Sequence, residues 1–524
     1  MLSEEKEVLE YIKEAFALRS QELYKQAIEK LYKALDLDND NVEVLYQLGE
    51  LYSFMHNHHR AIDYLEQVLE INSNHIESLN LMKNIYEKEE KYLEAMTFAK
   101  QIFEQQKTCE NLKEIIKLSG KLKQIDNIEN YKDDALCNED IIYEIANALY
   151  VNSKFEQAEK FLSQNLQNEN SKILLGKIYF NNNEIEKSKE IFLSFPKNTD
   201  NAEILNYQGL FALDNMNFIE AIKCFSKASS INKNNSVYFY NLGNAYFFNG
   251  WMKEAKKAYS NAIYINPDNL DYRYALAYLY YETNEFDKCK KETDAILSVC
   301  QTYSQARVLR ALLLNEQKEY GKSKEILENN LKDGHDDNFT LLALGKTYNY
   351  LDMFEKAEKT VLKVIERNPE NLNYISDLAD IYIKEKSFDK ALELAQKTIK
   401  LNPNFVYGYV LAAKIANLTG DFEKSKEYCQ EVLNLDMNCS DGYYYLALVR
   451  VNEKDYDEAI ECMKRAILYN AVNSEYYAKM SEIYRLKEDY QTALDYINEA
   501  ESISHSTEYK LMYKELVKLN RQKS

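Results

Sequence analysis

Apolar residues along the chain recur every three or four positions within short segments, which is the spacing of one face of an α-helix. One such set is Leu242, Ala245 and Tyr246, and the next is Ala255, Ala258, Tyr259 and Ala262. Turn-forming residues, Asn249 and Gly250, separate the two sets. The pattern therefore predicts two antiparallel helices of about 14 residues each, about 21 Å long, joined by a short turn.

The two-helix pattern returns every 34 residues, without insertion, over residues 202–507. These blocks begin at Ala202, Ser236, Leu270, Ser304, Asn338, Leu372, Val406, Ser440 and Ser474, and further blocks begin at Val8, Val42, Ile76, Glu139 and Glu169. One helix pair cannot bury its apolar face alone, so neighbouring pairs must stack. Asn235, Asn269 and Asn371, which precede three of the blocks, are predicted to cap their first helices.

Two places in each block hold small side chains. The eighth place holds Ala15, Gly49, Lys83, Ala146, Gly176, Gly209, Gly243, Ala277, Ala311, Gly345, Ala379, Ala413, Ala447 and Ser481. The twentieth place holds Ala27, Ala61, Ala95, Ala158, Ser188, Ala221, Ala255, Cys289, Ser323, Ala357, Ala391, Ser425, Ala459 and Ala493. Small residues that face each other allow two helix axes to approach to about 8 Å. We therefore expect both columns to lie at the contact between the two helices.

These columns, together with a mostly aromatic seventeenth place, resemble the tetratricopeptide repeat over most of the chain. The resemblance implies an all-α fold, an α-solenoid in which about 14 to 15 antiparallel helix pairs stack into a right-handed superhelix. The bulky aromatic residue that is usual near the start of the first helix is mostly replaced here, for example by Leu45 and Leu205. The single tryptophan, Trp251, falls in a turn.

The repeat pattern divides the chain into four sections. Residues 1–109 and 139–507 carry the repeats, whereas the small columns vanish in residues 110–138. This middle section still has the pattern of two helices, and we expect a degenerate repeat that bends the array, with a flexible hinge as the alternative. Residues 508–524 place apolar side chains on one helical face and are predicted to cap the last repeat. A basic interaction tail is the alternative for these residues.

Composition narrows the classes of partner and location. The net charge of −20 repels nucleic-acid phosphates and anionic lipid headgroups, so neither is expected as a partner. No stretch approaches 18 apolar residues, and the acidic N-terminus lacks the features of a signal peptide. The eight cysteines form no CxxC pair. We expect a cytoplasmic protein that does not insert into membranes.

No motif of an enzyme, cofactor or metal site is recognised. The chain lacks GxGxxG, GxxxxGK[ST] and HExxH, and little sequence is left outside the repeats for a catalytic domain. His56, His58 and His59 are expected to lie in a solvated turn, without the spacing that aligns two metal ligands on one helix face. Adventitious metal binding is the alternative there. We therefore expect no enzymatic activity and no cofactor.

The resemblance implies that the first helix of each block lines a concave groove. The second, fifth, ninth and twelfth places of the block should then be exposed. The candidate peptide-binding residues at these places are Tyr46, Tyr143, Tyr240, Asn244, Tyr274, Tyr278, Tyr281 and Tyr444, with acidic neighbours such as Glu43, Asp271, Asp380 and Asp441. Tyrosine offers a rigid apolar face and a hydroxyl, and acidic neighbours favour a basic or amphipathic segment.

Two groove chemistries known for this family do not match the chain. A carboxylate clamp would need Lys and Asn where Tyr240, Ala275 and Gln305 stand, and an asparagine ladder would need Asn in place of Tyr207 and Leu309. The sequence therefore predicts an adaptor that binds a protein or peptide in an acidic, tyrosine-rich groove. Two alternatives remain open. The alternative function is that of a structural subunit that uses its convex face and array ends. The alternative explanation of the tyrosines is that they reflect composition alone.

Overall fold

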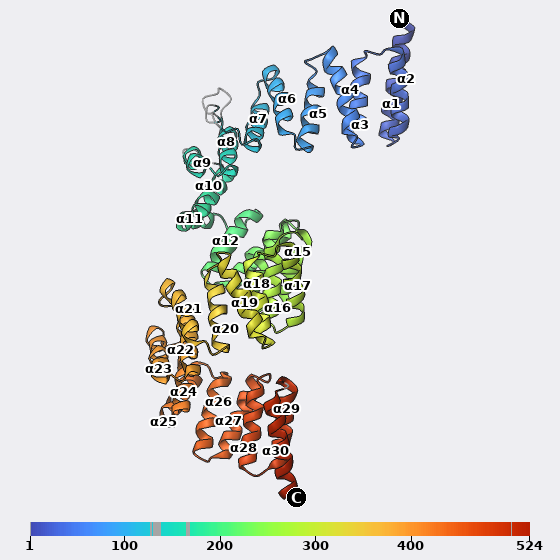
Figure 1. Cartoon of the computed structure of the whole chain (residues 1–524). Helices are drawn as coiled ribbons and strands as arrows, with labels where there is room; N and C mark the ends of the chain where they lie inside the picture. Colours follow the sequence, from blue (N-terminus) through green and yellow to red (C-terminus); the bar gives the residue numbers. More distant parts are fainter. Residues whose placement is uncertain are drawn as a thin grey trace. The chain divides into compact units, whose positions relative to one another are not determined.

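The computed structural model describes residues 2–125, 128, 131, 138–163, 168–504 and 506–523. In these residues the chain forms thirty α-helices and no β-strand (Figure 1). The all-α solenoid fold predicted from the repeat is confirmed. The chain separates into two compact units, residues 1–249 and residues 250–524, which are called here the N-terminal unit and the C-terminal unit.

The N-terminal unit contains fourteen of the described helices. They are α1 (Leu2–Ser20), α2 (Tyr24–Leu37), α3 (Val42–Phe54), α4 (His58–Ile71), α5 (Ile76–Lys88), α6 (Tyr92–Gln105), α7 (Cys109–Lys121), α8 (Glu139–Val151), α9 (Phe155–Leu162), α10 (Glu169–Asn181), α11 (Ile185–Ser194), α12 (Ala202–Asp214), α13 (Phe218–Ile231) and α14 (Ser236–Phe248).

The C-terminal unit contains the remaining described helices. They are α15 (Met252–Ile265), α16 (Leu270–Glu282), α17 (Phe286–Val299), α18 (Ser304–Glu316), α19 (Tyr320–Lys332), α20 (Asn338–Tyr350), α21 (Phe354–Arg367), α22 (Leu372–Glu385), α23 (Phe388–Leu401), α24 (Val406–Thr419), α25 (Phe422–Leu435), α26 (Ser440–Asn452), α27 (Tyr456–Tyr469), α28 (Ser474–Leu486), α29 (Tyr490–Ser504) and α30 (Thr507–Lys523).

Several first helices begin with the side-chain cap that the sequence predicted. Asn235 Oδ1 accepts a hydrogen bond from the Val237 amide at 3.0 Å, and Asn371 Oδ1 accepts one from the Asn373 amide at 3.0 Å. Asn269 caps α16 in the same way. These side chains satisfy amide groups that the first turn of a helix leaves unpaired. The predicted caps are therefore confirmed.

The small columns lie at the contact between the two helices of a pair. All fourteen residues at the twentieth place have no exposed surface. A Cβ atom at Gly345 would lie 2.6 Å from Val361 Cγ2, and one at Gly176 would lie 2.6 Å from Phe192 Cε2. The helices are thus too close for larger side chains, as the sequence predicted. Lys83 is the exception at the eighth place, and its ammonium reaches Glu114 Oε2 at 3.2 Å.

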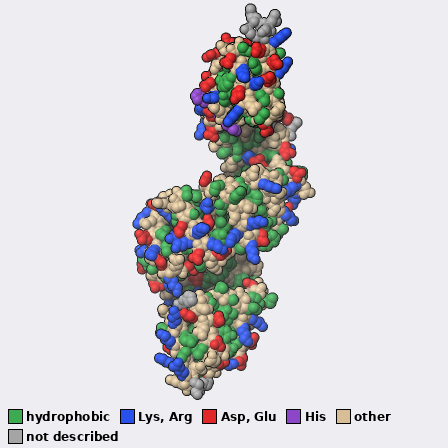
Figure 2. Space-filling view, turned by 90° about the vertical axis from the view of Figure 1, so that its right-hand side faces the viewer, with side chains coloured by type: hydrophobic (Ala, Val, Ile, Leu, Met, Phe, Trp, Pro, Cys, Tyr) green, Lys and Arg blue, Asp and Glu red, His purple; other side chains and the backbone are tan. Residues whose placement is uncertain are grey.

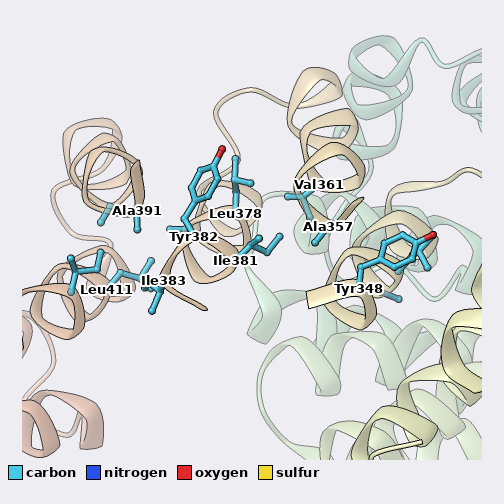
Figure 3. Packing of buried hydrophobic residues seen from close by; sticks show 14 of the residues in the cluster. Tyr348, Ala357, Val361, Leu378, Ile381, Tyr382, Ile383, Ala391 and Leu411 are labelled. Atoms are coloured by element: carbon cyan, nitrogen blue, oxygen red, sulfur yellow. The ribbon is translucent and has the colours of Figure 1, made fainter. Parts of the chain in front are cut away.

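Buried residues of α18 to α24 form a continuous hydrophobic cluster that joins several helix pairs. Figure 3 shows part of this cluster, with Ala357 and Ala391 among the larger side chains of Leu378, Ile381 and Leu411. Residues of successive pairs share one core, so no pair is a separate domain. This is the stacking that the repeat requires.

The turn between the two helices of a block uses one left-handed residue. In all fourteen blocks the residue at the fifteenth place has a φ between 57° and 82°, yet only Gly250 and Gly420 of these residues are glycines. Lys123 has a φ of 58° at the corresponding place after α7. The first helix and turn of the predicted degenerate repeat therefore keep the repeat geometry.

The second helix predicted within residues 110–138 falls largely outside the described residues, and the four-section division of the chain stays a prediction. At the other end of the chain, α30 packs against α29. Leu516 of α30 is 2% exposed and contacts a cluster that includes Leu494 and Ile497. Among the described helices, none is both long and apolar enough to cross a membrane.

Candidate functional site

The first helices of consecutive pairs contact one another directly. In the C-terminal unit these contacts run from α16 to α18, α20, α22, α24 and α26. One aromatic contact joins first helices that are two repeats apart. The ring centroids of Tyr278 on α16 and Phe339 on α20 lie 6.3 Å apart. Elements on the inner side of a curved stack approach each other most closely. The first helices of this unit therefore form its concave surface.

A pocket of about 650 Å³ opens on this surface between α18, α20, α22 and α24. It is called here the α18–α24 pocket. Leu312, Phe339 and Leu342 supply apolar walls that remain partly exposed, and Ile383 belongs to the buried cluster beneath. Its volume lies within the range of about 300–1,000 Å³ that is typical of ligand sites. The pocket can accept a large apolar side chain.

Most charged groups around the α18–α24 pocket are paired with one another. The Asp380 carboxylate accepts a hydrogen bond from the Tyr407 hydroxyl at 2.8 Å and one from Lys414 Nζ at 3.1 Å. Lys384 Nζ donates to the Asn349 carbonyl at 2.6 Å and lies 2.9 Å from Asp352 Oδ1. These pairs tie α20, α22 and α24 together across the pocket.

Asp377 on α22 is different, because its exposed carboxylate forms no direct ion pair with any described residue. The concave walls nevertheless surround it on several sides, and this partial burial raises its pKa to about 6. Lys346 on α20 opposes the rise in pKa, and Asp380 adds to it. Lys346 is itself exposed and forms no direct ion pair in the described part of the chain. The pocket thus has one fixed carboxylate without a partner.

Surface charges of both signs are interspersed on the face shown in Figure 2. The overall charge of −20 therefore does not describe the local electrostatics. The charge around the α18–α24 pocket follows from its own residues, in which two aspartates face three lysines. The lining of this pocket therefore holds more lysines than aspartates, and the acidic character of the groove stays a prediction.

Comparison with family models identifies the repeat. The tetratricopeptide repeat models match residues 18–85 and residues 237–269, 406–439 and 440–473, and a model of the N-terminal tetratricopeptide repeat region of Psidin matches residues 271–411. The chain is a tetratricopeptide repeat protein. This fold is typical of protein–protein interaction scaffolds and of subunits in multiprotein assemblies.

Solved structures with a similar fold share little sequence with this tetratricopeptide repeat protein. The APC/C hetero-tetramer Cut9–Hcn1 has a TM-score of 0.48 and 12% identity, over 84% of this chain and 96% of that chain. Yeast Tom70 has a TM-score of 0.42 and 14% identity, over 93% of this chain and 96% of that one. A repeat protein from Parabacteroides merdae has a TM-score of 0.40 and 19% identity, over 47% and 98%. A comparison with curated proteins found no match.

Several tyrosines of the tetratricopeptide repeat protein tie neighbouring pairs together through carboxylates. The Tyr444 hydroxyl on α26 donates to Glu475 Oε1 on α28 at 2.6 Å, and the Tyr476 hydroxyl on α28 donates to Asp441 Oδ1 on α26 at 2.6 Å. Burial, reinforced by the nearby carboxylates, raises the pKa of both phenols, so they remain protonated donors. Similar bridges join Tyr281 to Glu316, Tyr303 to Asp271 and Tyr407 to Asp380.

The structure brings together only part of the predicted tyrosine set. Tyr274 and Tyr278 lie side by side on α16, with ring centroids 6.2 Å apart, and Tyr281 follows them on the same helix. Tyr240 and Asn244 lie on α14, which belongs to the N-terminal unit. Their roles in binding, like those of the rest of the set, stay predictions.

Three other residues of the set lie elsewhere on first helices. Tyr46 on α3 has its ring centroid 5.3 Å from that of His75, and Tyr143 on α8 packs against a buried cluster. Tyr444 is only 6% exposed, although its place in the block predicted an exposed side chain. The stacked ring of Tyr476, with its centroid 5.1 Å away, helps to cover it.

The histidine segment also differs from its expected position. His58 and His59 are the first residues of α4 and do not lie in the turn, because the side chain of Asn57 caps the helix at the Arg60 amide. His58 Nδ1 lies 3.1 Å from Glu89 Oε1. Among the described residues, no three potential metal ligands converge.

Sequence reasoning named only Asp380 among the residues that line the α18–α24 pocket. Lys346 and Lys414 occupy the ninth place of their blocks and Tyr407 the second, which are places predicted to be exposed. The ninth places of three consecutive repeats hold Lys346, Asp380 and Lys414, and this alternation of charge was a usable signal. Asp377 occupies the sixth place, which gave no such signal.

Proposed function

We propose that this tetratricopeptide repeat protein is a non-enzymatic adaptor that binds a segment of a partner protein on the concave surface of its C-terminal unit. The observation that carries the proposal is the α18–α24 pocket, which combines partly exposed apolar walls with charged groups. Tyr274, Tyr278 and Tyr281 extend the same helical surface along α16. The proposal includes a cytoplasmic location and requires no cofactor.

The chemistry of this surface favours a polypeptide over other ligands. Covering the partly exposed side chains of Leu342 and Phe339 with an apolar side chain of a ligand is favourable, because it removes apolar surface from water. Nearby carboxylates can accept hydrogen bonds from a peptide, and nearby phenol hydroxyls can donate hydrogen bonds to it. Such bonds determine the orientation of the peptide. A surface of successive helices can contact successive side chains of a segment, as grooves for helical or extended peptides do.

The test compares the same substitution on two neighbouring helices. Leu342→Asp on α20 introduces a charge into the pocket, whereas Leu362→Asp on α21 introduces it on a second helix, where Leu362 is already 38% exposed. Partners captured from native extract are quantified by mass spectrometry with the two variants and the wild type. We expect the pocket variant to lose partners that the control variant retains.

The opposite pattern would favour the alternative function. A structural subunit that uses its convex face would lose its partners in the Leu362→Asp variant and keep them in the Leu342→Asp variant. It would also co-purify with them at fixed stoichiometry, whereas adaptor partners should exchange. Hydrogen exchange of both free variants is the control, because it shows whether either substitution unfolds its helix pair.

A further inference from the structure

Asp377 differs from the lysines around it in how it responds to a bound ligand. Its short side chain keeps the carboxylate at the surface of the pocket between α20, α22 and α24, where neighbouring protein atoms already raise its pKa. Lys346 has a long, exposed side chain that can turn its ammonium towards water when the pocket fills. A ligand that covers the pocket therefore removes water from Asp377 more completely than from Lys346.

Covering an unpaired carboxylate carries a large free-energy penalty unless the ligand supplies a positive charge. The charged groups around Asp377 do not supply it. Lys414 and Tyr407 on α24 are both bonded to Asp380, and Lys384 is bonded to Asn349 and Asp352. Lys346 on α20 influences Asp377 electrostatically but forms no ion pair with it. A cation on the ligand is therefore the missing partner of Asp377.

The apolar walls specify the neighbouring part of the ligand. Leu312, Phe339 and Leu342 remain partly exposed beside Asp377 in the same pocket. A large apolar side chain there would bury them and would also exclude water from the ion pair, which strengthens it. The two requirements meet in a peptide in which an apolar residue lies next to a basic one.

We propose that the α18–α24 pocket binds a peptide segment in which a large apolar side chain contacts Leu312, Phe339 and Leu342 and an adjacent arginine or lysine pairs with Asp377. This inference rests on the proposed function and adds to it the chemical class of the bound segment. Lys346 acts against binding, because it repels the incoming cation.

The test uses the full chain and three dye-labelled peptides of equal length. One alternates Leu and Arg, one alternates Leu and Glu, and one alternates Ser and Arg. Fluorescence anisotropy should show the tightest binding for the Leu–Arg peptide. Asp377→Asn should weaken this binding at least about fivefold, because it removes one member of a partly desolvated charge pair. Lys346→Gln should strengthen it.

A matched control separates the pocket from the overall charge. Asp389→Asn changes the net charge equally, but Asp389 is exposed on α23, a second helix, and does not line the pocket. We expect it to change the affinity less than about twofold, as for an exposed charge. Equal effects of the two substitutions would overturn the proposal, and so would stronger binding of the Leu–Glu peptide or no binding of the Leu–Arg peptide.

The two proposals can fail separately. If the Leu–Arg peptide does not bind but Leu342→Asp still abolishes partner capture, the adaptor function stands and the preference for a basic segment is wrong. If Leu342→Asp leaves capture unchanged, the concave surface is not the partner site, whatever the peptides do.

Discussion

Replacing Gly345 with alanine tests the close helix contact on which the repeat depends. The new methyl group would lie 2.6 Å from Val361 Cγ2 and 3.7 Å from the Ala357 carbonyl oxygen. Val361 is 1% exposed and belongs to the shared cluster of α18 to α24, so it cannot turn into solvent (Figure 3). Either α21 moves away from α20 or Val361 leaves its preferred rotamer.

The size of the effect follows from two opposing contributions. Overpacking a well-packed core costs about 1–3 kcal/mol. Alanine is preferred to glycine within a helix by about 0.5–1 kcal/mol, which offsets part of that cost. We therefore expect Gly345→Ala to lower the local free energy of unfolding of α20 and α21 by about 1–2 kcal/mol. Hydrogen exchange with mass spectrometry measures this quantity for each helix pair.

Gly321 provides the matched control, because it lies in helix α19 and a Cβ atom there would have no neighbour within 4 Å. Gly321→Ala should be neutral or slightly stabilising. Val361→Ala should also lower the free energy of unfolding less in the Gly345→Ala variant than in the wild type, by about 1 kcal/mol or more. The packing argument is refuted if Gly345→Ala stabilises the pair as Gly321→Ala does, or if the two substitutions at the contact are additive.

Three further predictions concern other parts of the chain. The folded-state pKa of Asp377, about 6, exceeds the ordinary value of about 3.9, so its charge destabilises the folded state above pH 6 and this effect disappears as the pH falls towards 4. Calorimetry should thus show that Asp377→Asn raises the melting temperature at pH 7 but not at pH 4, and equal effects at both would contradict the prediction. Tyr444→Phe should lower the protection of α26 and α28 from hydrogen exchange by about 1.5 kcal/mol, because the charged Glu475 carboxylate loses the hydrogen bond from the phenol. Tyr264→Phe, at an 89% exposed position, should have no effect. Lys318→Gly should stabilise α18 and α19 by about 0.5 kcal/mol in the same assay, because Lys318 has a φ of 62°, and a loss of protection would contradict this.

The features that the sequence predicted best are those that one physical constraint determines in every repeat. At Gly345 or Ala357 the opposing helix leaves no room for a larger side chain, so the composition of the column reveals the contact. The left-handed fifteenth place is equally regular in structure, but Met216 and Lys386 occupy it as well as Gly250. The packing of two helices imposes this φ on whichever residue is there, so composition did not reveal it.

The candidate site was only partly predictable for a related reason. Whether a first-helix residue is exposed depends on its neighbours in the next repeat as well as on its place in the block. Tyr444 is covered because Tyr476 follows it in space, whereas Asp377 is accessible because α20 and α24 leave a pocket beside it. A single block of sequence contains no information about these neighbours.

The most direct test of the account is a hydrogen-exchange footprint of the C-terminal unit in the full chain, measured with and without a partner whose capture Leu342→Asp abolishes. The account predicts added protection in the first helices α18, α20, α22 and α24, and little change in the second helices α19, α21 and α23. Protection confined to the second helices or to the ends of the chain would show that the concave surface does not bind the partner.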